Sequence, residues 1–158
     1  MNSGTLVATN VAFHDSAKLI NTNSNENGGS IVIDDDNQGT FTNVDFVNNK
    51  ITCTSGNGYG AAVFIGKNAV GKFTNVKFQG NQVNQGDGGA VYIDRGKGYF
   101  TNCTFASNVV TNGRAGGIYA NIKAFVQVIN NVFSDNRAPQ NSLAGVHIYY
   151  ESSTPMYI

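Results

Sequence analysis

Two short signatures alternate along this chain of 158 residues and recur at intervals of about 30 residues. The first is a pair of small residues, Gly or Ala, followed by aliphatic residues, and it occupies residues 28–31, 60–63, 88–91, 116–118 and 144–146. The second is a Phe with an Asn three residues later, found as Phe46/Asn49, Phe78/Asn81, Phe105/Asn108 and Phe133/Asn136. A fixed period of this length indicates stacked repeats, each of which buries its apolar side against its neighbours. We therefore expect columns of like residues along the molecule.

The spacing of the signatures divides the chain into repeats of unequal length. The steps between Phe13, Phe46, Phe78, Phe105 and Phe133 are 33, 32, 27 and 28 residues. The extra residues of the first two repeats lie at 17–27 and 50–58, between the Phe and the next Gly pair. Insertions in a solenoid map to loops on one side, so loops are expected there. Because the repeats cover the whole chain, the sequence predicts a single domain over residues 1–158.

Each repeat contains short strand patterns separated by turn residues. Residues 91–93 and 100–105 alternate with a period of two, and no window shows a useful helical period. A repeat of this length without a helix fits a coil of three short strands. We therefore predict an all-β fold, a single-stranded right-handed parallel β-helix (β-solenoid) of about five rungs of 27–33 residues.

A second column of asparagines lies three residues before the Phe positions. Its members are Asn10, Asn43, Asn75, Asn102 and Asn130. A side-chain amide can donate to one neighbour and accept from another. We therefore expect these residues to form an inward-facing asparagine ladder beside a core built from the Phe and aliphatic columns.

The residue after each aliphatic anchor is expected to point outward, and four of these residues carry rings. They are Phe64, Tyr92, Tyr119 and His147. Rings stacked at the spacing of neighbouring strands can bind sugars, pack on another protein, or only stabilise the sheet by stacking on one another. The sequence leaves these three interpretations open, and this aromatic column is the candidate binding site.

The repeated tetrapeptides resemble those of the passenger domains of polymorphic outer-membrane proteins and related adhesin-like β-helix proteins. The direct matches are the Gly-Gly-Ala-Val run at residues 88–91 and the four Phe-x-x-Asn units, and residues 28–31 and 60–63 are near matches. Phe13 is followed by Ser16, and residues 116–118 lack the Ala. The resemblance implies a secreted or surface-displayed right-handed β-helix with adhesive or structural roles.

Carboxylates do not form the pattern that a polysaccharide-degrading enzyme needs. Asp34 and Asp94 share one column, but Gly66 lies between them, which separates the two carboxyl groups by about 10 Å. Acid–base catalysis needs a partner group that this column does not supply. The acidic run that begins at Asp34 fits a solvated turn, and His14 and His147 lie in different repeats. We expect no catalytic residue, no metal site and no cofactor.

Composition narrows the choice of partners and of compartment. Ten basic and ten acidic residues give a formal net charge of zero, which argues against nucleic acid, because phosphates require a basic face. Only 13% of the residues are charged, so little repulsion opposes self-association. The two cysteines do not make a disulfide framework, and no segment has the pattern of a signal peptide or of a membrane span. An extracellular or cell-surface location is expected, with any signal or flanking region absent from this chain.

The two ends of the predicted solenoid are in the same angular phase. Ala8 and Met156 fall in one column, and no capping helix is apparent. Open end coils can continue into further coils or stack head to tail on other copies. The first functional hypothesis is therefore a non-enzymatic structural or adhesive subunit whose partners are copies of itself, and also glycans or a host surface. The alternatives are a carbohydrate-binding module of a larger adhesin and a pectate-lyase-like enzyme.

Overall fold

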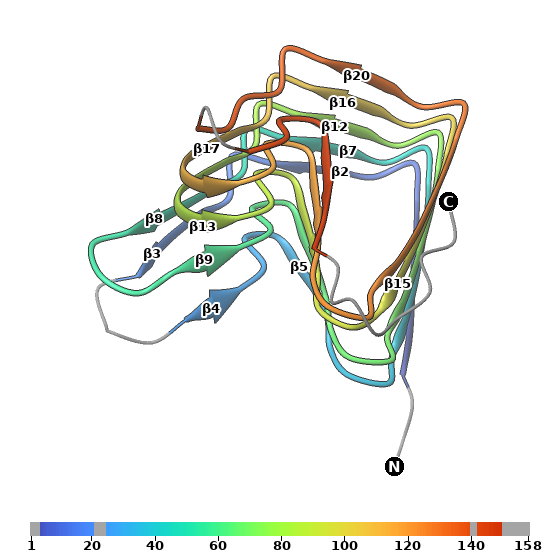
Figure 1. The fold of residues 1–158 in the computed structure, drawn as a ribbon. Coiled ribbons are helices and arrows are strands. Elements are labelled where there is room, and N and C mark those ends of the chain that lie inside the picture. The colour runs from blue at the N-terminus through green and yellow to red at the C-terminus, as the bar shows by residue number, and fades with distance from the viewer. Residues whose placement is uncertain (1–3, 21–24, 140–141, 150–158) are drawn as a thin grey trace.

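The computed structural model describes residues 4–20, 25–139 and 142–149. Within them every named element is a strand and every pairing is parallel. The strands stack as a parallel β-solenoid of about four turns (Figure 1). The predicted fold class is thereby confirmed, while its handedness stays a prediction. Met156 lies outside the described residues.

Three sheets of five strands each form the walls of the solenoid. Sheet A contains β1 (Thr5–Thr9), β6 (Gln38–Thr42), β11 (Val70–Thr74), β15 (Lys97–Thr101) and β19 (Phe125–Ile129). Sheet B contains β2 (Ala12–His14), β7 (Asp45–Val47), β12 (Lys77–Gln79), β16 (Thr104–Ala106) and β20 (Val132–Ser134). Sheet D contains β5 (Ile31–Ile33), β10 (Val63–Ile65), β14 (Val91–Ile93), β18 (Ile118–Ala120) and β21 (Val146–Ile148). Five strands in each sheet agree with the about five rungs that the sequence predicted, and the chain passes from β1 to β19 in about four turns.

A fourth sheet, sheet C, projects from this body as a wing (Figure 1). Its strands are β3 (Ala17–Ile20), β4 (Glu26–Asn27), β8 (Lys50–Cys53), β9 (Gly58–Tyr59), β13 (Gln82–Asp87) and β17 (Val109–Arg114). Much of the two segments expected to be loops, 17–27 and 50–58, is thus paired in this sheet. The reason is a small core of their own, in which Ile51 and Cys53 pack with Val83 and Val110. The first four coils therefore cross four sheets, and not the three strand positions that the sequence predicted.

The register of the sheets reproduces the columns read from the sequence. The aliphatic anchors Ile31, Val63, Val91, Ile118 and Val146 are paired in order across sheet D. Inside the solenoid, Phe rings from sheets A and B stack in two columns, with centroids 4.9 Å apart for Phe73 and Phe100 and 4.6 Å apart for Phe78 and Phe105. The two columns also touch edge to face. Stacked and edge-on rings of this kind add to the stabilisation from burial.

The buried asparagine ladder is built from the second signature and not from the predicted residues. Asn49, Asn81 and Asn108 are fully buried, and each side chain bonds to the next asparagine along the axis, ending at Asn136. All four also donate to the carbonyl oxygen of the Phe in the preceding coil. These bonds satisfy polar groups that water cannot reach.

The predicted ladder residues Asn10, Asn43, Asn75, Asn102 and Asn130 are exposed at the corner between sheets A and B. Their inward placement was wrong, because each has φ between 53° and 55°, a left-handed conformation that Asn tolerates and that turns its side chain out of the core. Surface amide bonds of 3.1 Å still join Asn43 to Asn10 and Asn75 to Asn43.

Candidate functional site

The predicted aromatic column exists but is buried. Its rings stack along sheet D, with centroids 5.7 Å apart for Phe64 and Tyr92 and 5.2 Å apart for Tyr92 and Tyr119. His147 continues the column as a tilted ring 5.2 Å from Tyr119. The exposed fractions are 6% for Phe64, 7% for Tyr92 and 1% for Tyr119. The outward-pointing rings are therefore not exposed to solvent, and they stack on one another.

The wing is what covers these rings. Tyr59 on β9 lies against Tyr92 with ring centroids 4.6 Å apart, and the guanidinium of Arg114 lies 4.6 Å above the ring of Tyr119. Ala115 joins the same cluster. Sequence reasoning missed this cover because it treated residues 17–27 and 50–58 as loops. The repeat pattern gives no signal for this cover, because β9 has only two residues.

An ion pair fixes Arg114 over the column. Asp87 is buried, and its carboxylate accepts from Arg114 Nε at 3.1 Å, Nη2 at 2.9 Å and the backbone N–H at 2.8 Å. The carboxylate raises the pKa of Arg114, which burial alone would lower. A cavity of about 290 Å³ opens on this side of the wing, with Asn57 and Gln85 in its lining. The pair holds Arg114 rigidly, as a cation–π contact over Tyr119 requires.

Burial of the tyrosines predicts a loss of stability at alkaline pH. Removal from water raises the pKa of Tyr92 above its ordinary range and that of Tyr119 to about 12. The unfolded chain ionises these phenols near the ordinary value of 10.0, so it releases protons before the folded chain does. The free energy of unfolding is therefore unaffected below about pH 10 and falls as pH rises toward 12. We expect tyrosinate absorbance to rise late, together with loss of the β circular dichroism signal.

Tyr119→Phe provides the matched variant for that titration. The Tyr119 hydroxyl is buried without a hydrogen-bond partner among the described residues, so its removal breaks no bond. We expect the variant to unfold at higher pH than the wild type. Titration of all seven tyrosines near pH 10, with the fold intact, would contradict the buried column.

The carboxylates considered for catalysis are not brought together. Asp94 accepts from Arg95 Nη2 at 2.6 Å and from Asn121 Nδ2 at 3.0 Å. Asp34 lies two coils away, with Gly66 between them. His14 lies in sheet B and His147 in sheet D. In the described segments, no group of three His, Cys, Asp or Glu side chains is arranged to hold a metal ion.

The surfaces that stand out are the two ends of the solenoid. All large hydrophobic side chains that are exposed in the described residues lie in the first or the last coil: Leu6, Val7, Val11, Leu19, Val32, Val128, Ile129, Val132, Leu143 and Tyr149. Several belong to columns that are buried elsewhere. Val128, for example, is 45% exposed, whereas Phe100, its neighbour in the column, is 0% exposed. The end coils therefore expose the cross-section of the core.

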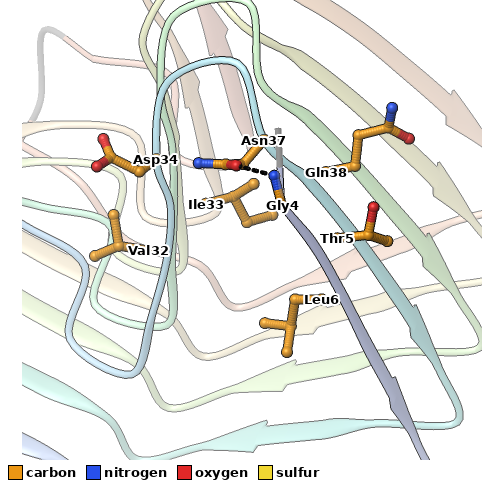
Figure 2. A pocket seen from close by; sticks show the side chains of 8 residues that line it. All are labelled: Gly4, Thr5, Leu6, Val32, Ile33, Asp34, Asn37 and Gln38. Carbon is orange, nitrogen blue, oxygen red and sulfur yellow. Dashed lines mark hydrogen bonds between the residues drawn. The ribbon is translucent and has the colours of Figure 1, made fainter. Parts of the chain in front are cut away.

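The first coil is also hollowed at its open end. A pocket there has a volume of about 250 Å³. Figure 2 shows the residues that line it, with Leu6 and Ile33 between Val32 on one side and Thr5 beside Gln38 on the other. The pocket is closed on one side by the 2.6 Å bond from Gly4 N–H to the side-chain oxygen of Asn37. Its lining is mixed, with apolar side chains beside amides. This surface could receive side chains from another coil.

Comparison with known proteins found no matching family model, no similar curated protein and no similar solved structure. No described helix is long and apolar enough to cross a membrane. The fold and the surfaces above are thus the basis for any functional assignment.

Proposed function

We propose that this chain is a non-enzymatic structural β-solenoid subunit that assembles head to tail at the cell surface or outside the cell. The observation that carries the proposal is that, among the described residues, the exposed large apolar side chains are confined to the two end coils. A monomer in water gains by covering such surface. The last coil of one copy against the first coil of the next would cover both ends at once.

Strand edges support the same arrangement. Within the described residues β19 pairs only with β15, and β1 pairs only with β6. Unpaired edges of parallel strands are templates for another strand. A second copy could place β1 beside β19 and so continue sheet A. A contact of this kind between unlike ends does not close on itself, and it produces an open filament.

The charges at one corner of the coil favour contact between the last coil of one copy and the first coil of another over contact between two first coils. The corner between sheets D and A carries Asp34, Asp35 and Asp36 in the first coil, and Lys123 in the last. Inside the molecule, a carboxylate already joins this corner to the next coil, because Asp35 accepts a hydrogen bond from the Lys67 N–H at 2.7 Å. With β1 of one copy beside β19 of another, the acidic turn of the first lies two coils, about 10 Å, from Lys123 of the second. Opposite charges then face each other along the stack, whereas head-to-head stacking brings two acidic turns toward each other.

The test is the state of association across a concentration series. From about 1 µM to 1 mM, we expect sedimentation to show growth of particles and electron microscopy to show rods that lengthen. Val128→Lys should shift the onset at least tenfold upward in concentration, because it places a charge on the end of the core. The matched control is Thr74→Lys on the outer face of sheet A, because Thr74 is exposed and lies on β11, the middle strand of that sheet.

Two results would contradict the proposal. One is a wild-type protein that stays monomeric over the whole series. The other is an equal shift from Val128→Lys and Thr74→Lys, since only Val128 lies in an end coil. Circular dichroism of each variant shows that it remains folded.

A further inference from the structure

A basic cavity lies at the corner between sheets D and A, along the middle and last coils. It has a volume of about 470 Å³, and its lining includes Lys67, Arg95, Gly96, Lys97, Lys123 and Phe125. The chain has ten Lys and Arg residues in total, and four of them meet here although the net charge is zero. This concentration of positive charge makes an anion the natural ligand.

Three of the four cations are free to bind such a ligand. Arg95 is paired with Asp94, at 2.6 Å from Nη2 to Oδ2. Lys67, Lys97 and Lys123 are exposed, and no carboxylate of the described residues forms a salt bridge with them. The unpaired ammonium groups belong to three successive coils. Neighbouring coils are about 4.8 Å apart, so the charges face one ligand together.

The backbone around the cavity is held rigidly. Lys97 N–H donates to Ala69 O at 2.8 Å, and Phe125 N–H donates to Gly96 O at 2.9 Å. A side chain at Gly96 would collide with the carbonyl oxygens of Gly66 and Ala69. Gly96 therefore lets this corner pack closely on the preceding coil, and the cavity lies over a fixed backbone.

An aromatic wall completes the cavity. Phe125 is half-buried, and its ring lies 5.4 Å from that of Tyr99 in a tilted arrangement. A flat ring face beside polar groups suits the apolar face of a sugar ring, while ammonium groups suit its carboxylate or sulfate. Inorganic anions would use the cations but not the ring.

We infer that this cavity binds an acidic sugar residue of a glycan chain, with its carboxylate or sulfate held by Lys67, Lys97 and Lys123 and its ring against Phe125. This site is separate from the buried column of Phe64, Tyr92, Tyr119 and His147. A nucleic acid fits less well, because phosphate neutralisation needs a long basic face, and the four cations here surround a single cavity.

Calorimetric titration with three trisaccharides of equal length tests the inference: one carboxylated, one sulfated and one neutral. We expect binding of at least one acidic trisaccharide, weakened by salt, and none of the neutral one. Whichever acidic form binds more tightly identifies the charged group. Lys67→Gln combined with Lys97→Gln should reduce affinity at least tenfold. The control pair, Lys50→Gln with Lys77→Gln, removes the same charge from sheets C and B and should change affinity less than twofold.

The inference is overturned by equal loss in both double variants, by equal affinity for the neutral trisaccharide, or by no binding of any trisaccharide. It is also overturned if inorganic sulfate or single-stranded DNA of the same charge binds as tightly, because the cavity would then recognise charge alone. Lys67 and Lys97 lie away from the end coils, so their replacement leaves the assembly test unchanged. Failure here is therefore distinguishable from failure of the proposed assembly.

Discussion

Asn81→Ala is expected to lower the free energy of unfolding by about 4 kcal/mol. Asn81 donates through Nδ2 to Phe46 O at 3.0 Å and to Asn108 Oδ1 at 2.9 Å. Its Oδ1 accepts from both the backbone N–H and the side chain of Asn49. Alanine leaves the Phe46 carbonyl and the Asn49 N–H buried without these partners, and each such group costs about 1–3 kcal/mol. Urea denaturation followed by circular dichroism measures the change.

The exposed asparagine column provides the matched control. Asn75 makes a surface bond to Asn43 at 3.1 Å and has φ 54°, which Gly adopts without strain. Asn75→Gly should therefore change the free energy of unfolding by about 0.5 kcal/mol or less. If Asn81→Ala costs no more than Asn75→Gly, the buried ladder does not stabilise the fold in the way that its hydrogen bonds indicate.

The stacked parallel strands and their register are predictable from this sequence because the repeat period is explicit in it. Ile31, Val63 and Val91 fall in one column when the chain is simply counted, and they pair in the structure. Counting does not show which side of the wall a column faces. Two asparagine columns share one period, and only the left-handed φ at residues such as Asn43 separates the outer from the inner one.

The environment of the aromatic column was not predictable in the same way. The two-residue alternation along the strands correctly places Phe64 and Tyr92 on the opposite side of sheet D from the Phe core of the solenoid. It carries no information about which other residues cover their rings. Tyr59 and Arg114 cover these rings, and they arrive through strand pairs of sheet C. Two-residue strands such as β9 are too short to give a pattern, so burial of the column depends on tertiary contacts that the period does not encode.

Close approach of the wing strands depends on three glycines. Gly58, Gly86 and Gly113 are aligned across β9, β13 and β17. Gly86 has φ 127° and Gly113 has φ 145°, a backbone conformation that residues with a Cβ atom rarely adopt. A Cβ at Gly86 would collide with the carbonyl oxygen of Gly58. Because β13 is paired on both sides, it cannot move away from this contact.

Gly86→Ala is therefore expected to lower the free energy of unfolding by about 3 kcal/mol or more, since backbone strain and the collision add. Separation of β9 from β13 would also lift Tyr59 off Tyr92. The tyrosine absorbance titration of the variant should then begin nearer the ordinary pKa of 10.0. Urea denaturation and the alkaline titration together measure both effects.

Gly145→Ala is the control that separates this effect from the loss of a glycine as such. A Cβ there meets only atoms of Phe133, at 3.8 to 3.9 Å, which is ordinary contact. Its column holds Ala62 and Ala90 in other coils, so the repeat already accepts a methyl group at this place. We expect a change within about 0.5 kcal/mol. A Gly86→Ala protein as stable as Gly145→Ala, with late tyrosine ionisation, would show that the wing covers the aromatic column without needing the glycine contact.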